Sequence, residues 1–178
     1  MFRLRLATPA DLPALRQLIT ESVHGLSSGF YTDRQIDSAL RHHFGPDTQL
    51  IADQTYFVIE DEAGGLAAAG GWSRRRTLHG GDQAKAAEDP VLDPASDAAR
   101  IRAFFVHPSW ARRGLARRLF ERCATDAADA GFRKLELVST LPGEALYRAL
   151  GFVEAERFVA PLPDGERLDV IRMVCELV

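Results

Sequence analysis

Residues 103–119 read AFFVHPSWARRGLARRL, and this stretch decides the fold. It begins with apolar residues typical of a strand, turns at Pro108, and enters an arginine-rich loop around Gly114 that leads into an amphipathic helix. The first N–H groups of a helix have no intrahelical partner, and the helix dipole places about half a positive charge there. Because Gly114 lets the backbone approach a ligand closely, the stretch predicts a binding site for an anion such as a pyrophosphate.

Two common nucleotide-binding motifs are missing from the sequence. It contains no G-x-x-x-x-G-K-[ST], which argues against a P-loop nucleotidase, and no G-x-G-x-x-G, which argues against a Rossmann dinucleotide site. The window ARRGLA at residues 111–116 instead resembles the acyl-CoA signature [QR]-x-x-G-x-[GA] of the GNAT superfamily of N-acyltransferases. Ala111 departs from that pattern, and Arg112 and Arg113 can supply the missing charge.

A second segment strengthens the resemblance. Residues 145–152 read ALYRALGF and are similar to the family's last helix and its exit into the following strand. The two segments are separated by enough chain for one helix and one strand, as the family requires. With their flanking elements they cover most of the chain.

The resemblance implies an enzyme that transfers the acetyl group of acetyl-CoA to an amine, on a small molecule or a peptide, by direct attack on the thioester. Acetyl-CoA would be a co-substrate, and no metal is expected because no cluster has ligand spacing. The pantetheine arm would run along the strand at residues 104–106 like an added strand. The residues implied to bind acetyl-CoA are Phe104, Phe105, Val106, Arg112, Arg113, Gly114, Leu115, Ala116 and Arg117.

Several of these residues also have a purely structural interpretation. The arginines could form a solvated helix start, although cations there are unfavourable unless an anion is near. Phe104 and Phe105 must face opposite sides of a strand, so we expect one of them to belong to the core. An amide of residues 105–106 could polarise the thioester carbonyl.

Tyr147 is the expected catalytic acid, because of its position in the second segment. A phenol with a pKa of about 10 suits a leaving thiolate of similar basicity. The alternative is a tyrosine that only packs at the junction of helix and sheet. A non-catalytic acyl-CoA-binding regulator on the same fold would lack such an acid, and we keep it as the alternative function.

The sequence does not identify a general base. His24, Tyr31, His107 and several glutamates are candidates, and a chain of water molecules could serve instead. His42 and His43 are expected to be exposed on a helix, and Glu136 to face outward from a strand. Residues 139–140, a serine and a threonine, could contact the pantetheine or cap the helix that Pro142 opens, and we favour the cap. The acceptor is expected to lie against residues 24–31, the insertion described below and the last hairpin.

Periodicity and caps predict strands and helices in the order β-α-α-β-β-β-α-β-α-β-β, a mixed α/β fold with helices on both faces of the sheet. The resemblance adds that the sheet is mostly antiparallel. Residues 74–99 break the periodicity and are expected to form a long irregular insertion. The expected strands are 2–6, 56–60, 66–73, 100–107, 134–139, 153–160 and 167–178.

Composition agrees with one globular domain spanning residues 1–178, of which 46% are hydrophobic. The net charge of −3 argues against a general nucleic-acid binder. Cys123 and Cys175 are expected to be buried, and no membrane-spanning run or signal peptide is seen. We therefore expect a cytoplasmic protein without membrane or nucleic-acid partners. A homodimer is possible.

Overall fold

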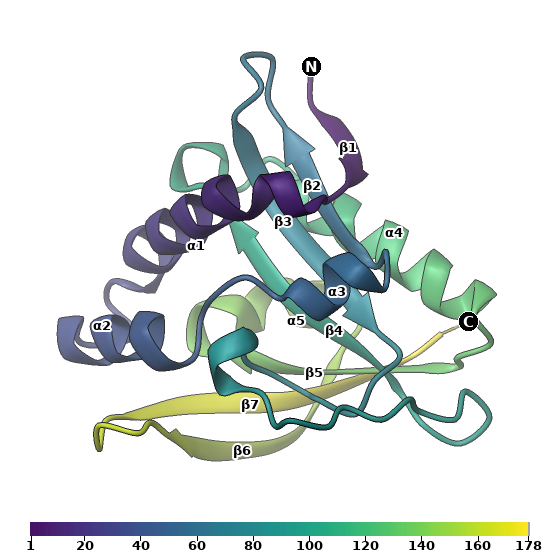
Figure 1. Ribbon diagram of the computed structural model, residues 1–178. Helices are drawn as coiled ribbons and strands as arrows, with labels where there is room; N and C mark the ends of the chain where they lie inside the picture. The colour runs from purple at the N-terminus through teal and green to yellow at the C-terminus, as the bar shows by residue number, and fades with distance from the viewer. Residues whose placement is uncertain (178) are drawn as a thin grey trace.

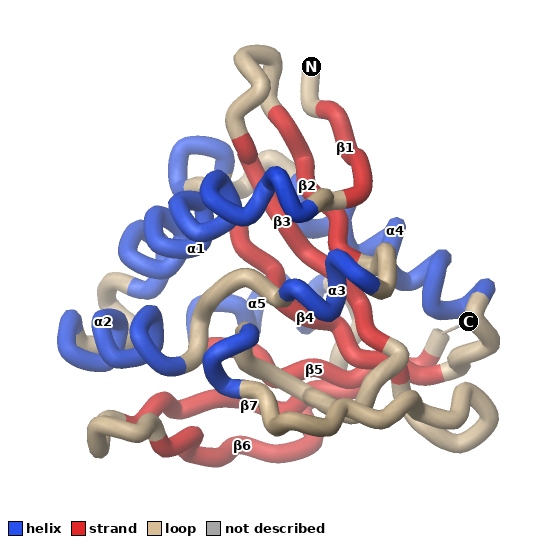
Figure 2. Tube along the Cα trace, in the orientation of Figure 1, coloured by secondary structure: helices blue, strands red, loops and turns tan. Residues whose placement is uncertain are grey.

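The fold is built on one mixed sheet, seen in a computed structural model that describes residues 1–177. Seven strands within that range form the sheet in the order β1-β2-β3-β4-β5-β7-β6 (Figure 2). The β4–β5 pair is parallel and the other pairs are antiparallel, as expected. The strands are β1 (Arg3–Leu6), β2 (Tyr56–Glu60), β3 (Leu66–Ser73), β4 (Ala99–Val106), β5 (Lys134–Thr140), β6 (Val153–Pro161) and β7 (Arg167–Glu176). Val178, predicted to end the last strand, lies outside the described residues.

Helices cover both faces of the sheet (Figure 1). On one face lie α1 (Leu12–Ser27), α2 (Asp33–His42) and α3 (Thr48–Ala52); on the other lie α4 (Leu115–Asp129) and α5 (Glu144–Ala149). The short helix α3 was not predicted, because five residues are too few for a helical period. The rest of the element order agrees with the prediction.

Successive side chains along each strand point to opposite faces of the sheet, so the core has one part on each face. Phe57 and Ile59 of β2 pack with α4, whereas Tyr56 and Val58 pack with the face of α1 that carries Leu15. This is the period of two that a strand imposes on its side chains. Cys123 is fully buried in the α4 side, but Cys175 is only partly buried, so the expectation of burial was wrong for Cys175.

The helix ends follow the predicted capping signals. The backbone N–H of Gln35 donates to the Oγ1 of Thr32 at 3.2 Å, which fixes the start of α2. Helix α4 ends at Asp129, and Gly131 follows with a φ of 95°, a left-handed conformation that suits glycine after a helix. No helix of residues 1–177 is both long and apolar enough to cross a membrane.

The sheet opens between β4 and β5. These strands pair only through Ala99 with Leu135 and Arg100 with Glu136, within residues 1–177, and then diverge. A register shift between β3 and β4 lies at the point of divergence, where Ala103 has a φ of 54°. Such a bulge bends a strand and increases its twist, so it turns the end of β4 away from β5.

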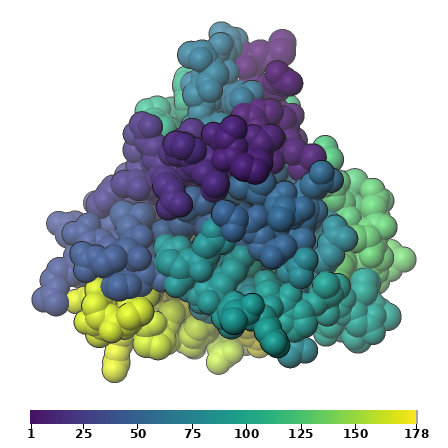
Figure 3. All heavy atoms as spheres, in the orientation of Figure 1, coloured from purple at the N-terminus to yellow at the C-terminus, as the bar shows by residue number. Residues whose placement is uncertain are grey.

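The predicted insertion is irregular, as expected, although β4 already begins at Ala99. It contains one short 3-10 turn, Asp82–Ala84. In the space-filling view its teal atoms lie between the blue atoms of the α2–α3 region and the yellow atoms of the C-terminal hairpin (Figure 3). Residues 78–81 of the insertion lie beside the opening in the sheet, because they line the same space as residues of β4 and β5.

Candidate active site

A continuous cavity of about 240 Å³ occupies the opening between β4 and β5. One part is formed by β4, the start of α4, the end of β5 and α5. The other part is formed by α1, the loop after α2, the insertion and β7. Residues as far apart in the sequence as Ser22 and Val170 thus line the same cavity.

The aromatic pair of β4 sits at the centre of this cavity. Phe104 packs with the α4 side of the core and Phe105 with the α1 side, which confirms that they face opposite ways. Both line the cavity, so neither is purely core. Gly70 of β3 leaves room for the Phe104 ring, since a Cβ there would lie 2.7 Å from the ring carbons Cδ2 and Cε2.

The backbone of β4 presents donors toward the opening. The N–H of His107 donates to the carbonyl of Ala67 on β3 at 2.9 Å. Because N–H directions alternate along a strand, the N–H of Val106 faces away from β3. It donates to the Oγ of buried Ser22 at 3.2 Å.

The loop before α4 has two residues in the left-handed region. Arg112 has a φ of 65° and Gly114 a φ of 78°. A Cβ at Gly114 would meet no atom within 4 Å, so the loop is open at this point. The first intrahelical bond joins the Arg118 N–H to the Gly114 carbonyl at 3.0 Å, which leaves the N–H groups of residues 115–117 for a ligand.

The arginine side chains of this loop lie around its rim. The guanidinium of Arg113 stacks 4.9 Å from the centre of the Trp110 ring, and that of Arg118 donates to the carbonyl of Phe2 at 2.9 Å. Arg117 donates to the carbonyl of Ala149 at a long 3.5 Å. These cations hold positive charge beside free N–H groups, an arrangement suited to phosphate.

The predicted cofactor residues fall into three groups. Phe104, Phe105, Val106 and Ala116 line the cavity, whereas Leu115 is buried in the core. The other predicted residues, Arg112, Arg113, Gly114 and Arg117, surround the start of α4 outside the cavity lining.

Tyr147 on α5 lines the cavity on the Phe104 side. Its ring makes edge contacts with Phe104 and Phe152, at centroid distances of 6.4 and 5.7 Å. Burial, and to a smaller extent the nearby Cys123, raises the pKa of the Tyr147 phenol above its ordinary value. The phenol is therefore protonated at neutral pH.

Ser139 and Thr140 do not cap a helix. The Oγ of Ser139 donates to the Thr140 carbonyl at 2.7 Å, and the turn after Thr140 has no side-chain cap. Both residues line the cavity instead, beside the β4–β5 opening. The favoured interpretation was wrong because the turn Leu141–Gly143 begins without a side-chain cap, and the Ser139 hydroxyl bonds a carbonyl rather than a helix N–H.

The candidate bases named from the sequence lie away from the cavity lining. Tyr31 donates to the carbonyl of Asp169 at 2.6 Å and accepts from the N–H of Leu141 at 3.0 Å, which is a structural bridge. His24 is exposed, and the Nε2 of His107 pairs with the Oε2 of Glu21 at 3.0 Å.

Two histidines that the sequence analysis missed do line the cavity. His43, expected to be exposed, lies just after α2 with its Nε2 3.3 Å from the Nδ1 of His79 in the insertion. Burial, His79 and Arg102 lower the pKa of His43 to about 4, and burial and Arg102 lower the pKa of His79. Both imidazoles are therefore neutral at pH 7.

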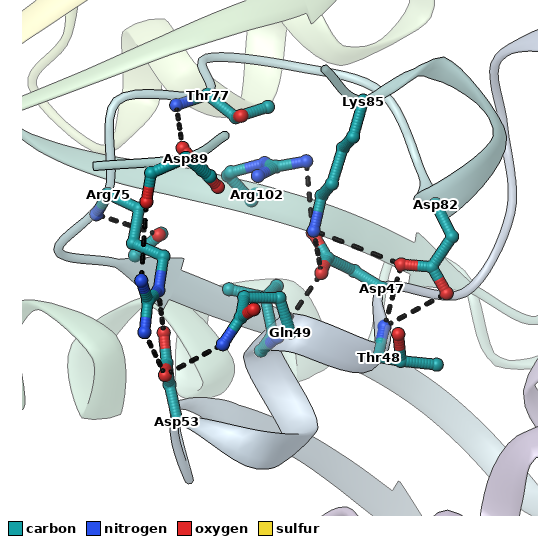
Figure 4. Close-up of polar contacts among 12 residues, drawn as sticks. Asp47, Thr48, Gln49, Asp53, Arg75, Thr77, Asp82, Lys85, Asp89 and Arg102 are labelled. Carbon is teal, nitrogen blue, oxygen red and sulfur yellow. Dashed lines mark hydrogen bonds and ion pairs between the residues drawn. The ribbon is translucent and has the colours of Figure 1, made fainter. Parts of the chain in front are cut away.

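A network of ion pairs fixes the insertion over the cavity (Figure 4). The buried carboxylate of Asp47 lies 2.9 Å from the Nη2 of Arg102 and also pairs with Lys85 of the insertion. A second anchor joins Arg75 to Asp53 through two bonds of 2.7 and 2.8 Å. These links hold an irregular segment in place without regular secondary structure.

Comparisons with known proteins agree with this architecture. The family model described as the acetyltransferase (GNAT) domain matches residues 52–154. No curated protein sequence matches the chain. A GCN5-related N-acetyltransferase structure from Rhodopseudomonas palustris is 16% identical, with a TM-score of 0.72 over 98% of this chain and 95% of that one.

Two further similar structures were determined with ligands. The phosphinothricin acetyltransferase from Sinorhizobium meliloti, in complex with acetyl-CoA, is 20% identical with a TM-score of 0.65, over 99% of this chain and 88% of that one. The PaiA N-acetyltransferase from Thermoplasma acidophilum, in complex with coenzyme A, is 12% identical with a TM-score of 0.66, over 99% of each chain. At these identities the likeness shows the fold.

Proposed function

Since this chain belongs to the GNAT acetyltransferase family, as the match over residues 52–154 shows, we propose that it transfers the acetyl group of acetyl-CoA to the nitrogen of an amine. The amine attacks the thioester directly, so a single active site must hold donor and acceptor together. The amine belongs to a small molecule or a peptide.

The observation that carries the proposal is the continuity of the cavity. It runs from Ala116 at the start of α4, along residues 104–106, to the insertion on the other side. In the proposed complex, the pyrophosphate binds the free N–H groups at the start of α4 and the pantetheine lies in the β4–β5 opening. The acceptor then enters from the side of α1 and the insertion.

The chemistry assigned to β4 and α5 follows from this arrangement. The Val106 N–H already bonds an oxygen, that of Ser22, and a thioester carbonyl is an equally suitable acceptor once bound. In the proposed reaction Tyr147 gives a proton to the leaving thiolate, whose basicity is close to that of an ordinary phenol.

Ligand-dependent stability tests the donor half of the proposal. Acetyl-CoA binds only the folded protein and should raise the melting temperature by mass action, whereas pantetheine, which lacks the phosphates, should raise it much less. Equal shifts, or no shift with acetyl-CoA, would contradict the proposed donor site.

Turnover tests the acceptor half. Thiol release from acetyl-CoA should accelerate when a panel of amines is added, and the acetylated amine should appear in equal amount. Binding of acetyl-CoA without transfer to any amine would instead support the non-catalytic regulator.

A further inference from the structure

The acceptor side of the cavity raises the question of where the proton of the amine goes. An alkyl amine arrives as an ammonium ion at neutral pH and must lose a proton before its nitrogen can attack. Within the described chain, no aspartate or glutamate is among the residues that line the cavity. The ionisable lining residues are His43, His79, Arg102 and Tyr147.

Two of these four groups cannot accept the proton. Arg102 is a permanent cation, 4% exposed, that lies against Asp47. Tyr147 is already protonated, as described above, and its proposed role is to donate a proton to the thiolate. The two histidines remain.

The histidines form a defined pair. The ring nitrogens Nε2 of His43 and Nδ1 of His79 lie 3.3 Å apart, and the ring centroids are 5.0 Å apart. Neighbouring aromatic rings hold the pair from both sides: Phe44 lies 5.3 Å from His43 and Phe158 lies 6.3 Å from His79, centroid to centroid. In a neutral pair one nitrogen donates and the other accepts, so each ring keeps one further nitrogen for other partners.

The backbone also supports the position of His43. A Cβ at Gly80 would lie 3.2 Å from the His43 Cε1, so the missing side chain of Gly80 lets the insertion approach the imidazole. The N–H of Gly81 donates to the carbonyl of His43 at 2.8 Å. The insertion and the end of α2 are therefore joined at the pair.

We propose that the His43–His79 pair is the proton acceptor for the attacking amine, a role that rests on the acetyltransferase function proposed above. The pair takes one proton from the ammonium, and the freed lone pair forms the C–N bond as the thioester carbonyl becomes an oxyanion. When the C–S bond breaks, Tyr147 protonates the thiolate. The second proton of the nitrogen returns through solvent to the tyrosinate, and the pair releases its proton to solvent.

The charges around the pair set its protonation state. Arg102 faces the pair from β4, and its charge is only partly balanced by Asp47, which also pairs with Lys85. This nearby cation keeps both imidazoles neutral at pH 7, so each has a lone pair that can accept a proton. The cation also makes the imidazoles weak bases, so the pair holds the proton only while the amine attacks and then releases it to solvent.

The test compares His43→Gln and His79→Gln with His42→Gln. His42 is one residue away on α2, outside the cavity lining, with its Nε2 3.6 Å from the Oδ2 of Asp164. The acceptors are 2-phenylethylamine, which is protonated at pH 7, and hydroxylamine, which is largely unprotonated. Acetyl-CoA affinity and thermal unfolding are measured for each variant.

We expect His43→Gln and His79→Gln to lower kcat/KM for 2-phenylethylamine at pH 7 by about a hundredfold or more. The loss should shrink as the pH approaches the pKa of the amine, and hydroxylamine should be affected far less. His42→Gln should behave as the unmodified protein. Equal loss with both nucleophiles at every pH, or a normal rate with 2-phenylethylamine, would overturn the proposal.

Two further measurements separate a chemical role from a folding defect. Added imidazole should restore part of the rate of His79→Ala, which it would not do if the ring were only structural. Ring ¹⁵N spectra should show two coupled titrations below the ordinary histidine pKa and a shared N–H···N proton. Two independent titrations near the ordinary histidine pKa would overturn the proposal even if neither amine is acetylated. Failure of the unmodified protein to bind acetyl-CoA, in contrast, contradicts the proposed function and not the pair.

Discussion

The ring of Phe104 packs so closely against Gly70 that a Cβ at Gly70 would lie 2.7 Å from two of the ring carbons. This contact joins β3 to β4 at the register shift where the sheet begins to open. The shape of the proposed pantetheine channel therefore depends on a glycine outside the acyl-CoA signature.

Gly70→Ala tests this contact. The added Cβ, 2.7 Å from the ring carbons, must displace Phe104, and overpacking of this kind costs about 1–3 kcal/mol of folding free energy. Denaturant unfolding measures the loss, and calorimetry should show weaker acetyl-CoA binding. Gly65→Ala in the exposed β2–β3 turn is the control, and Phe104→Leu should rescue Gly70→Ala in a double mutant; no loss in the single variant would refute the packing argument.

Gly114→Asp tests the anion site at the start of α4. Aspartate and asparagine have the same shape and both tolerate the left-handed conformation with φ 78° that this position requires. Gly114→Asn is therefore the matched control. We expect Gly114→Asp to weaken acetyl-CoA binding by about tenfold or more because it places a negative charge beside the pyrophosphate, whereas Gly114→Asn changes it little. Similar affinities for the two variants would show that no phosphate binds here.

Arg118→Ala provides a second comparison for the same site. Its guanidinium bonds the Phe2 carbonyl, a turn into α4, rather than the loop. We expect acetyl-CoA affinity to fall less than in Gly114→Asp. A larger loss would place the phosphate contacts further along the helix.

Tyr147→Phe removes only the hydroxyl and keeps both aromatic edge contacts. A proton-donor role predicts that kcat falls by about a hundredfold while acetyl-CoA affinity is unchanged. Steady-state kinetics with an acceptor from the amine panel, together with calorimetry for the donor, gives both values. Full activity would assign the proton to water and leave Tyr147 a packing role.

The lowered pKa of His43 predicts how stability depends on pH. Above the ordinary histidine pKa of about 6.5, the folded and unfolded states both hold a neutral ring. As the pH falls through 6.5, the unfolded state binds the proton first, and the folded ring follows only near its pKa of about 4. Stability should therefore fall between these values, by on the order of 1–3 kcal/mol.

Denaturant unfolding at pH 6.5 and 5.5 checks this dependence above the range in which most carboxylates titrate. His43→Gln should flatten the dependence, and His42→Gln should preserve it. An unchanged slope in His43→Gln would mean that its imidazole is not kept neutral by the fold.

Local sequence signals predicted the part of the candidate site that neighbouring residues of β4 and the start of α4 form. Alternation placed Phe104 and Phe105 on opposite faces, and the glycine at 114 marked the start of α4, because both depend on backbone geometry over a few residues. The proximity of His43 and His79 could not be predicted in this way. It depends on the path of an irregular segment that ion pairs to Asp47 and Asp53 hold in place, and no period encodes such a path.

The incomplete pairing of β4 with β5 also bears on how the protein avoids aggregation. Unpaired strand edges recruit strands from other chains, and proteins usually protect them with charge or cover. The outer strand β6 carries Glu154, Glu156 and Arg157 along its exposed length. The inner edges of β4 and β5 instead face each other across the cavity, which residues of α1, α5 and the insertion also line. The unpaired length of these two strands is thus enclosed within the fold and offers no surface on which copies of the protein could stack.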